Sequence, residues 1–143
     1  MPSGMTIKVR DPDDDYLGID IQASNDRFAG SAEVYAGLQE LSEFATRIAG
    51  FPSNPDDRRQ YVFGDRDPSV AGGYAGLRFY CFDLAGHAVV EIEIGEDHGR
   101  YGTAMAHLSF RIEAAALDQF VNALRELEKA RFGEVFLPAA RPG

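Results

Sequence analysis

The sequence predicts an α+β fold, with one antiparallel sheet of about six to seven strands and two helices packed on one of its faces. Short segments with alternating apolar residues, separated by polar turns, indicate neighbouring antiparallel strands. Two further segments repeat their apolar residues every three or four positions, which indicates amphipathic helices. The expected order is β-β-β-α-β-β-β-β-α in a single domain spanning residues 1–143, with flexible ends at 1–4 and 138–143.

The first half of the chain provides three strands, one helix and a short fourth strand. Runs of Asp, Asn and Pro, which are turn formers, separate the first strands. Gly50 and Pro52 end the first helix, whose apolar residues have helical spacing. A polar loop that looks solvent exposed follows it. The expected segments are strands 6–9, 17–22 and 28–35, helix 38–48, loop 52–59 and strand 61–63.

The second half is patterned more regularly. It contains three strands and a closing helix with apolar residues at helical spacing. The turn from Asp83 to His87 joins the first two of these strands, and we expect the Asp83 side chain to cap turn amides while Gly86 takes a positive φ. The strands are expected at 77–82, 88–94 and 103–112, and the helix carries Leu117, Phe120, Val121, Leu124 and Leu127.

Side-chain parity predicts the register of these strands, and with it two different faces. The first pairing sets Cys81 opposite Ala88, Phe79 opposite Val90 and Leu77 opposite Ile92. The second sets Ile94 opposite Ala104, Ile92 opposite Ala106 and Val90 opposite Leu108. One face is therefore apolar and can be buried under the helices. The other carries Arg78, Glu91 and His107 in one cross-strand row, with Tyr80 and Glu93 beside them.

The composition narrows the class of protein. There are 23 Asp and Glu against 14 Lys and Arg, which gives a net charge of −9 and a pI near 4.7. An acidic surface disfavours nucleic acid and suits a cationic partner. No run approaches the ~18 apolar residues of a membrane span, and the first residues lack the pattern of a secretion signal, so we expect a cytoplasmic protein. The single cysteine, Cys81, excludes an internal disulfide and is expected to be buried in the core.

The row of Arg78, Glu91 and His107 can be interpreted in two ways. A carboxylate beside an imidazole can orient the ring for acid/base chemistry. Complementary charges on an exposed sheet face also stabilise cross-strand pairs by about 0.2–1 kcal/mol without any catalytic role. Because we expect no Ser, Cys or Lys nucleophile nearby and no loop that forms a cleft, we expect a contact surface for another protein and no catalytic residues.

Neither a metal nor a cofactor is expected. The three histidines are dispersed and match no metal-ligand spacing. The acidic run Asp11–Asp15 lacks the glycine and the closing glutamate of a calcium loop. The glycine-rich stretch Gly72–Gly76 leads into a strand, whereas a phosphate-binding loop opens onto a helix N-terminus.

The Asp83-x-x-Gly86-His87 hairpin, the strands at 88–94 and 104–112 and the helix through Leu117 and Phe120 together resemble a loose group of small bacterial proteins. Some of that group are immunity proteins of contact-dependent or polymorphic toxin systems, including the WapI-type proteins. The resemblance covers the second half of the chain. It implies a non-enzymatic inhibitor that binds one toxin tightly, and it identifies no catalytic residues.

The leading hypothesis is thus a cytosolic protein that binds another protein, with a basic toxin as the partner. Alternatives are an enzyme or small-molecule-binding domain, using the Arg78/Glu91/His107 face or a pocket under the loop 64–73, and a homodimer formed through that face. Loops with a negative charge would attract a basic partner from a distance. The binding residues would therefore include acidic residues that lie outside the Arg78/Glu91/His107 face. Those carboxylates are Asp13 to Asp15, Asp56, Asp57, Glu96 and Asp97.

Overall fold

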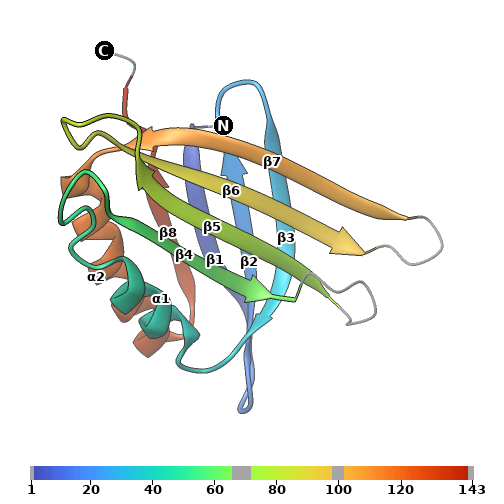
Figure 1. Ribbon diagram of the computed structural model, residues 1–143. Helices are drawn as coiled ribbons and strands as arrows, with labels where there is room; N and C mark the ends of the chain where they lie inside the picture. Colours follow the sequence, from blue (N-terminus) through green and yellow to red (C-terminus); the bar gives the residue numbers. More distant parts are fainter. Residues whose placement is uncertain (1, 66–71, 98–101, 142–143) are drawn as a thin grey trace.

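The computed structural model describes residues 2–65, 72–97 and 102–141, and within them the α+β class is confirmed (Figure 1). The prediction of a single sheet is wrong in detail, because the strands form two antiparallel sheets of four strands each. Sheet A has the strand order β3-β2-β1-β8 and sheet B the order β4-β5-β6-β7. The elements are β1 Gly4–Pro12, β2 Leu17–Ser24, β3 Ala29–Ala36, α1 Glu40–Ile48, β4 Arg58–Gly64, β5 Gly73–Cys81, β6 Ala88–Asp97, β7 Thr103–Ile112, α2 Ala114–Ala130 and β8 Gly133–Pro138.

The strand β8 is absent from the predicted order. Its pairing with β1 explains why the first half of the chain forms its own sheet. It pairs antiparallel with β1, so that Met5 lies opposite Leu137 and Ile7 opposite Val135. These four side chains are buried. Since β2 occupies the other edge of β1 and β3 pairs with β2, sheet A is complete without any strand of sheet B.

The register of sheet B is confirmed on one side of β6 and corrected on the other. The predicted pairs of β5 with β6 are all present, including Phe79 with Val90. Between β6 and β7 the prediction is wrong by two residues, because Ile92 lies opposite Leu108 and Val90 opposite Phe110. The midpoint of the β6–β7 pairing lies one residue further along the chain than the sequence pattern indicated. A shift of two residues preserves side-chain parity, so the predicted apolar face is still the buried one.

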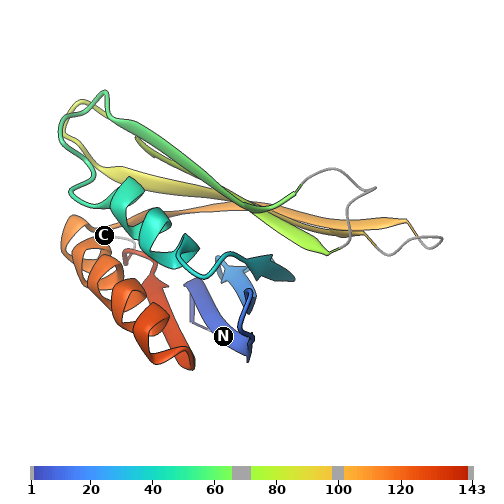
Figure 2. The same cartoon turned by 90° about the horizontal axis from the view of Figure 1, so that it is seen from below.

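The two sheets and the helices form a wedge (Figure 2). The sheets come together where β3 contacts all four strands of sheet B, and they diverge on the side where the helices lie. Helix α2 packs on β8 and on α1, and α1 also contacts β4. The helices therefore fill the open side of the wedge and leave the outer face of sheet B uncovered (Figures 1 and 2).

Aromatic side chains fill the space between α1 and sheet B. Phe44 of α1 is fully buried, and its ring lies 5.1 Å from that of Phe63, 5.2 Å from Tyr61 and 6.3 Å from Phe120. The α1 N-terminal turn lacks a capping side chain of its own, and the Glu128 carboxylate of α2 accepts hydrogen bonds from the amide and hydroxyl of Ser42 instead. These contacts fix α1 against the edge strand β4.

Candidate functional site

The outer face of sheet B carries the predicted row of polar side chains. The register places Arg78 directly opposite Glu91, as expected, but His107 lies opposite Glu93 and Ser109 lies opposite Glu91. His107 therefore reaches Glu91 diagonally, with 3.7 Å between Nε2 and Oε1. Arg78 contacts the other carboxylate oxygen, also at 3.7 Å. The structure thus brings the three side chains together, although not in one straight row, and the expectation that no serine lies nearby is wrong, because Ser109 pairs with Glu91.

These contacts are loose. Both distances exceed the 2.7–2.9 Å of a charge-assisted hydrogen bond. The side chains of Arg78 and His107 are 60% and 61% exposed, so the ion pairs contribute only about 0–1 kcal/mol. Such side chains can exchange one partner for another at little cost. They suit a contact surface, and the His107 ring has no hydrogen bond to Glu91 that would orient it for proton transfer.

Glu93 and Tyr80 complete the predicted face, and the Glu93 carboxylate already accepts a hydrogen bond within the chain. The Tyr74 hydroxyl donates a hydrogen bond of 2.8 Å to the Glu93 carboxylate. The Tyr74 ring lies over Gly95, where a Cβ atom would be only 2.5 Å from a ring carbon. The absence of a side chain at Gly95 therefore allows Tyr74 to cover the sheet and hold Glu93.

The acidic residues proposed to contact a basic partner are not gathered in one place. The loop with Asp56 and Asp57 lies at the opposite end of sheet B from the end of β6 that carries Glu96 and Asp97 (Figure 1). Glu96 also has a structural role, because its carboxylate accepts a hydrogen bond of 2.8 Å from the backbone amide of Glu33 in β3. The residues Asp13 to Asp15 follow β1, in sheet A.

The loop before β4 is exposed from Ser53 to Asp56, as predicted, but Asp57 is an exception. Its side chain is only 12% exposed, because it pairs with Arg59 through hydrogen bonds of 2.8 Å and 3.2 Å. These bonds from the guanidinium lower the pKa of Asp57 from 3.8 to about 2. The amide of Ser53 also donates to the same carboxylate. The loop between α1 and β4 is therefore held by its own charged side chains.

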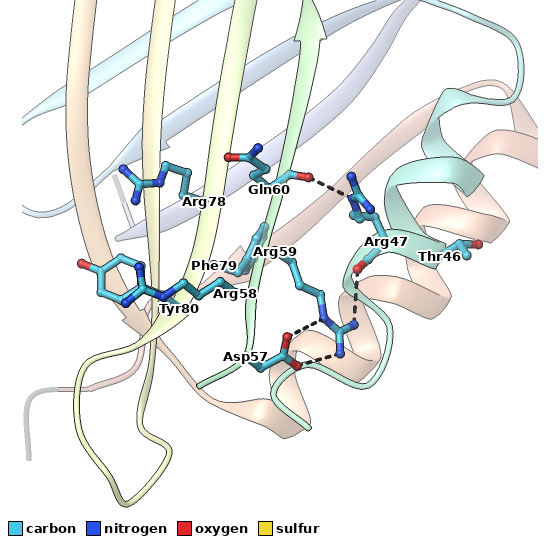
Figure 3. Close-up of a pocket in the computed structure, with 9 residues that line it drawn as sticks. All are labelled: Thr46, Arg47, Asp57, Arg58, Arg59, Gln60, Arg78, Phe79 and Tyr80. Atoms are coloured by element: carbon cyan, nitrogen blue, oxygen red, sulfur yellow. Dashed lines mark hydrogen bonds and ion pairs between the residues drawn. The ribbon is translucent and has the colours of Figure 1, made fainter. Parts of the chain in front are cut away.

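An open depression of about 720 Å³ lies at the β4 edge, and the sequence analysis did not identify it (Figure 3). Its lining combines α1, the loop before β4, and β4 and β5 themselves. Arg58 and Arg59 are neighbours in the sequence, but nothing in the sequence pattern places Arg47 of α1 or Arg78 of β5 beside them. The described lining residues are Thr46, Arg47, Asp57, Arg58, Arg59, Gln60, Arg78, Phe79 and Tyr80.

Two of these arginines hold the scaffold. Arg59 donates to the carbonyls of Arg47 and Ala49 at the C-terminal end of α1, in addition to its pair with Asp57. Arg47 in turn donates through Nε to the carbonyl of Gln60 at 3.1 Å. Edge strand, loop and helix are thus joined at the depression, which fixes the backbone from which the other arginines project.

Comparisons with known proteins found no match for this chain. No protein-family model matches the chain. No curated protein and no solved structure is significantly similar to it. The resemblance to immunity proteins is therefore carried by the sequence pattern alone.

The hairpin from Asp83 to His87 has the predicted turn chemistry. The Asp83 carboxylate accepts hydrogen bonds of 3.1 Å from the amides of Ala85 and His87, and Gly86 has a φ of +83°. The His87 ring lies 2.6 Å from the other carboxylate oxygen, and its hydrogen bond holds the pKa of Asp83 below its ordinary value. This pair stabilises the turn.

The single thiol is less buried than predicted. Cys81 is half-buried at the end of β5, where it packs against the core, and its Sγ lies 3.9 Å from the carbonyl of Asn54. Burial raises the pKa of the thiol, which disfavours the reactive thiolate.

The described residues form neither a metal-ligand cluster nor a membrane-spanning helix. No group of three or more His, Cys, Asp or Glu is placed to hold a metal ion. None of the helices found there is long and apolar enough to cross a membrane. The alternative pocket under the loop 64–73 involves residues 66–71, which lie outside the described ranges.

Proposed function

We propose that this chain is a non-enzymatic binding protein that contacts another protein through the outer face of sheet B. The observation that carries the proposal is the loose cluster of Arg78, Glu91 and His107, with Arg78 and His107 exposed, on a sheet face that neither α1 nor α2 covers. Tyr80 stands next to the cluster and is partly exposed. Tyrosine and arginine are the residue types that contribute most at protein interfaces.

The partner that this proposal favours is a basic protein, and a toxin neutralised by this chain is the specific candidate. Support comes from the net charge of −9 and from the sequence resemblance to WapI-type immunity proteins. Because the carboxylates are spread over several loops, the negative charge would accelerate the encounter from a distance. The close contacts would then be made by the face itself, with Asp57 and Glu96 serving the fold.

A capture experiment tests the face directly. The purified chain is immobilised, incubated with lysate of its native host, and compared with a Tyr80→Ala/His107→Ala variant. The matched control is Tyr35→Ala, which removes an exposed tyrosine from the outer face of sheet A. We expect one stoichiometric basic protein with the native chain and the control, and little of it with the double variant. Equal capture by all three would refute the outer face as the binding surface.

The salt dependence of the captured complex tests the electrostatic part separately. If long-range attraction steers the encounter, the association rate falls steeply as ionic strength rises while the dissociation rate changes little. A rate of association that does not depend on salt would contradict steering. Light scattering of the free protein addresses the alternative of a homodimer, which would place two outer faces against each other.

A further inference from the structure

Four arginines around the β4 edge distinguish this region from the rest of an acidic protein. The whole chain has 23 acidic and 14 basic residues, yet the described lining of the depression contains four arginines and only one carboxylate. That carboxylate, Asp57, is already held by Arg59. The three other arginines, Arg47, Arg58 and Arg78, have no carboxylate partner within the lining. The depression is therefore locally positive.

Arg58 and Arg78 are placed to act on one ligand. In the register of β4 with β5, Arg58 lies opposite Tyr80 and Gln60 lies opposite Arg78. The two arginines are thus diagonal neighbours on the outer face, a separation that long side chains bridge (Figure 3). The Arg58 side chain forms no hydrogen bond or ion pair with the rest of the described chain, and Arg78 has only the loose contact of 3.7 Å with Glu91.

We infer that this depression binds a small molecule through a phosphate group, with Arg58 and Arg78 donating to the phosphate oxygens. A phosphate monoester carries a charge of about −1.5 to −2 near neutral pH, which matches two guanidinium groups, one without an ion pair to the described residues and one held only loosely by Glu91. The planar guanidinium donates two parallel hydrogen bonds to such oxygens. Arg47 supplies a third positive charge across the strand, and the Tyr80 ring offers an apolar flank to the remainder of the molecule.

The size of the ligand follows from the volume of the depression and from the charge of the whole protein. A volume of about 720 Å³ falls within the range of small-molecule sites, about 300–1,000 Å³. A nucleic acid would extend beyond the depression, where its phosphates would meet the field of a protein with a net charge of −9. A small anion that stays within the depression interacts mainly with the positive charges of the nearby arginines. The arrangement therefore favours a single phosphorylated molecule over a polymer.

Isothermal titration calorimetry of the free protein with inorganic pyrophosphate tests the inference without any protein partner. Ionic strength is kept constant with sodium chloride. We expect saturable 1:1 binding that is weakened at least about tenfold in Arg58→Gln/Arg78→Gln. The matched control is Arg27→Gln/Arg141→Gln, which removes the same charge from two exposed arginines outside the depression and should bind as the native chain does. Circular dichroism confirms that each variant is folded.

Three results would overturn the inference. The first is the absence of saturable binding to the native chain, and the second is an equal loss of affinity in the control variant. The third is binding of citrate or of a single-stranded oligonucleotide more tightly than pyrophosphate, since that would identify a carboxylate or polymer site. Failure of the capture experiment with a protein partner would leave these results unaffected, because pyrophosphate is added to the isolated chain.

Discussion

The ion pair between Asp57 and Arg59 makes a quantitative prediction about acid stability. The pair joins the loop before β4 to the C-terminal end of α1, and both side chains are mostly shielded from water, with 12% and 19% exposed. Replacing Asp57 by Asn keeps the shape of the side chain and removes its charge. The variant thus isolates the charge-dependent part of the interaction.

The magnitude follows from the pKa of the carboxyl group. Asp57 has a pKa of about 2 in the folded chain against 3.8 ordinarily. At 1.36 kcal/mol for each tenfold change in proton affinity, this difference corresponds to about 2 kcal/mol of folding free energy. Because the folded pKa is lowered, this stabilisation is fully present above about pH 4–5 and is lost as the pH falls through about 2. Protonation of the Asp57 carboxyl group therefore removes this stabilisation.

Urea unfolding between pH 7 and pH 2 provides the measurement. We expect Asp57→Asn to be less stable than the native chain by about 2 kcal/mol at pH 7, with the gap closing toward the acid end. The neighbouring variant Asp56→Asn is the control, because the Asp56 side chain forms no hydrogen bond or ion pair within the described chain. A gap that stays constant down to pH 2, or an equal loss in the control, would refute the reasoning.

Three further substitutions test the core, the outer face and the hairpin. Phe44→Ala should cost about 3–5 kcal/mol in urea unfolding, since it opens a cavity among four aromatic rings; a loss below about 1 kcal/mol would contradict this packing. Gly95→Ala should cost about 1–2 kcal/mol in thermal unfolding by displacing the Tyr74 ring, and much less in a Tyr74→Ala background. His87→Gln should raise the pKa of Asp83 toward its ordinary value in an NMR titration, and an unchanged pKa would argue against the hydrogen bond.

Local patterns in the sequence predict the strands and faces of sheet B because each strand there pairs with the strand that precedes or follows it in the chain. A turn as short as Asp83 to His87 fixes the pairing of β5 with β6, and the structure confirms it. The predicted strands 88–94 and 103–112 leave residues 95–102 between them, whereas β6 extends to Asp97, so the predicted centre of this connection is misplaced and the register is wrong by two residues. Parity alone still identified the buried face.

The division into two sheets could not be read from such patterns. It depends on β8 pairing with β1 at the other end of the chain, and no local signal specifies a partner so distant. The alternation of Val135 and Leu137 with Glu134 and Phe136 does indicate a strand, although the predicted order lacks it. The arginine-lined depression has no sequence signal for a related reason, because the α1–β4 contact that brings Arg47 beside β4 is tertiary.

The pairing of β1 with β8 also has a consequence for how the chain is made. Sheet B consists of consecutive strands and can assemble as soon as they leave the ribosome, whereas sheet A has to wait for Gly133–Pro138. Until then, the edge of β1 that β8 will cover is open and can pair with another chain. Shortening the chain before residue 133 would leave that edge permanently open, so truncated chains should aggregate even though most of the core residues are present.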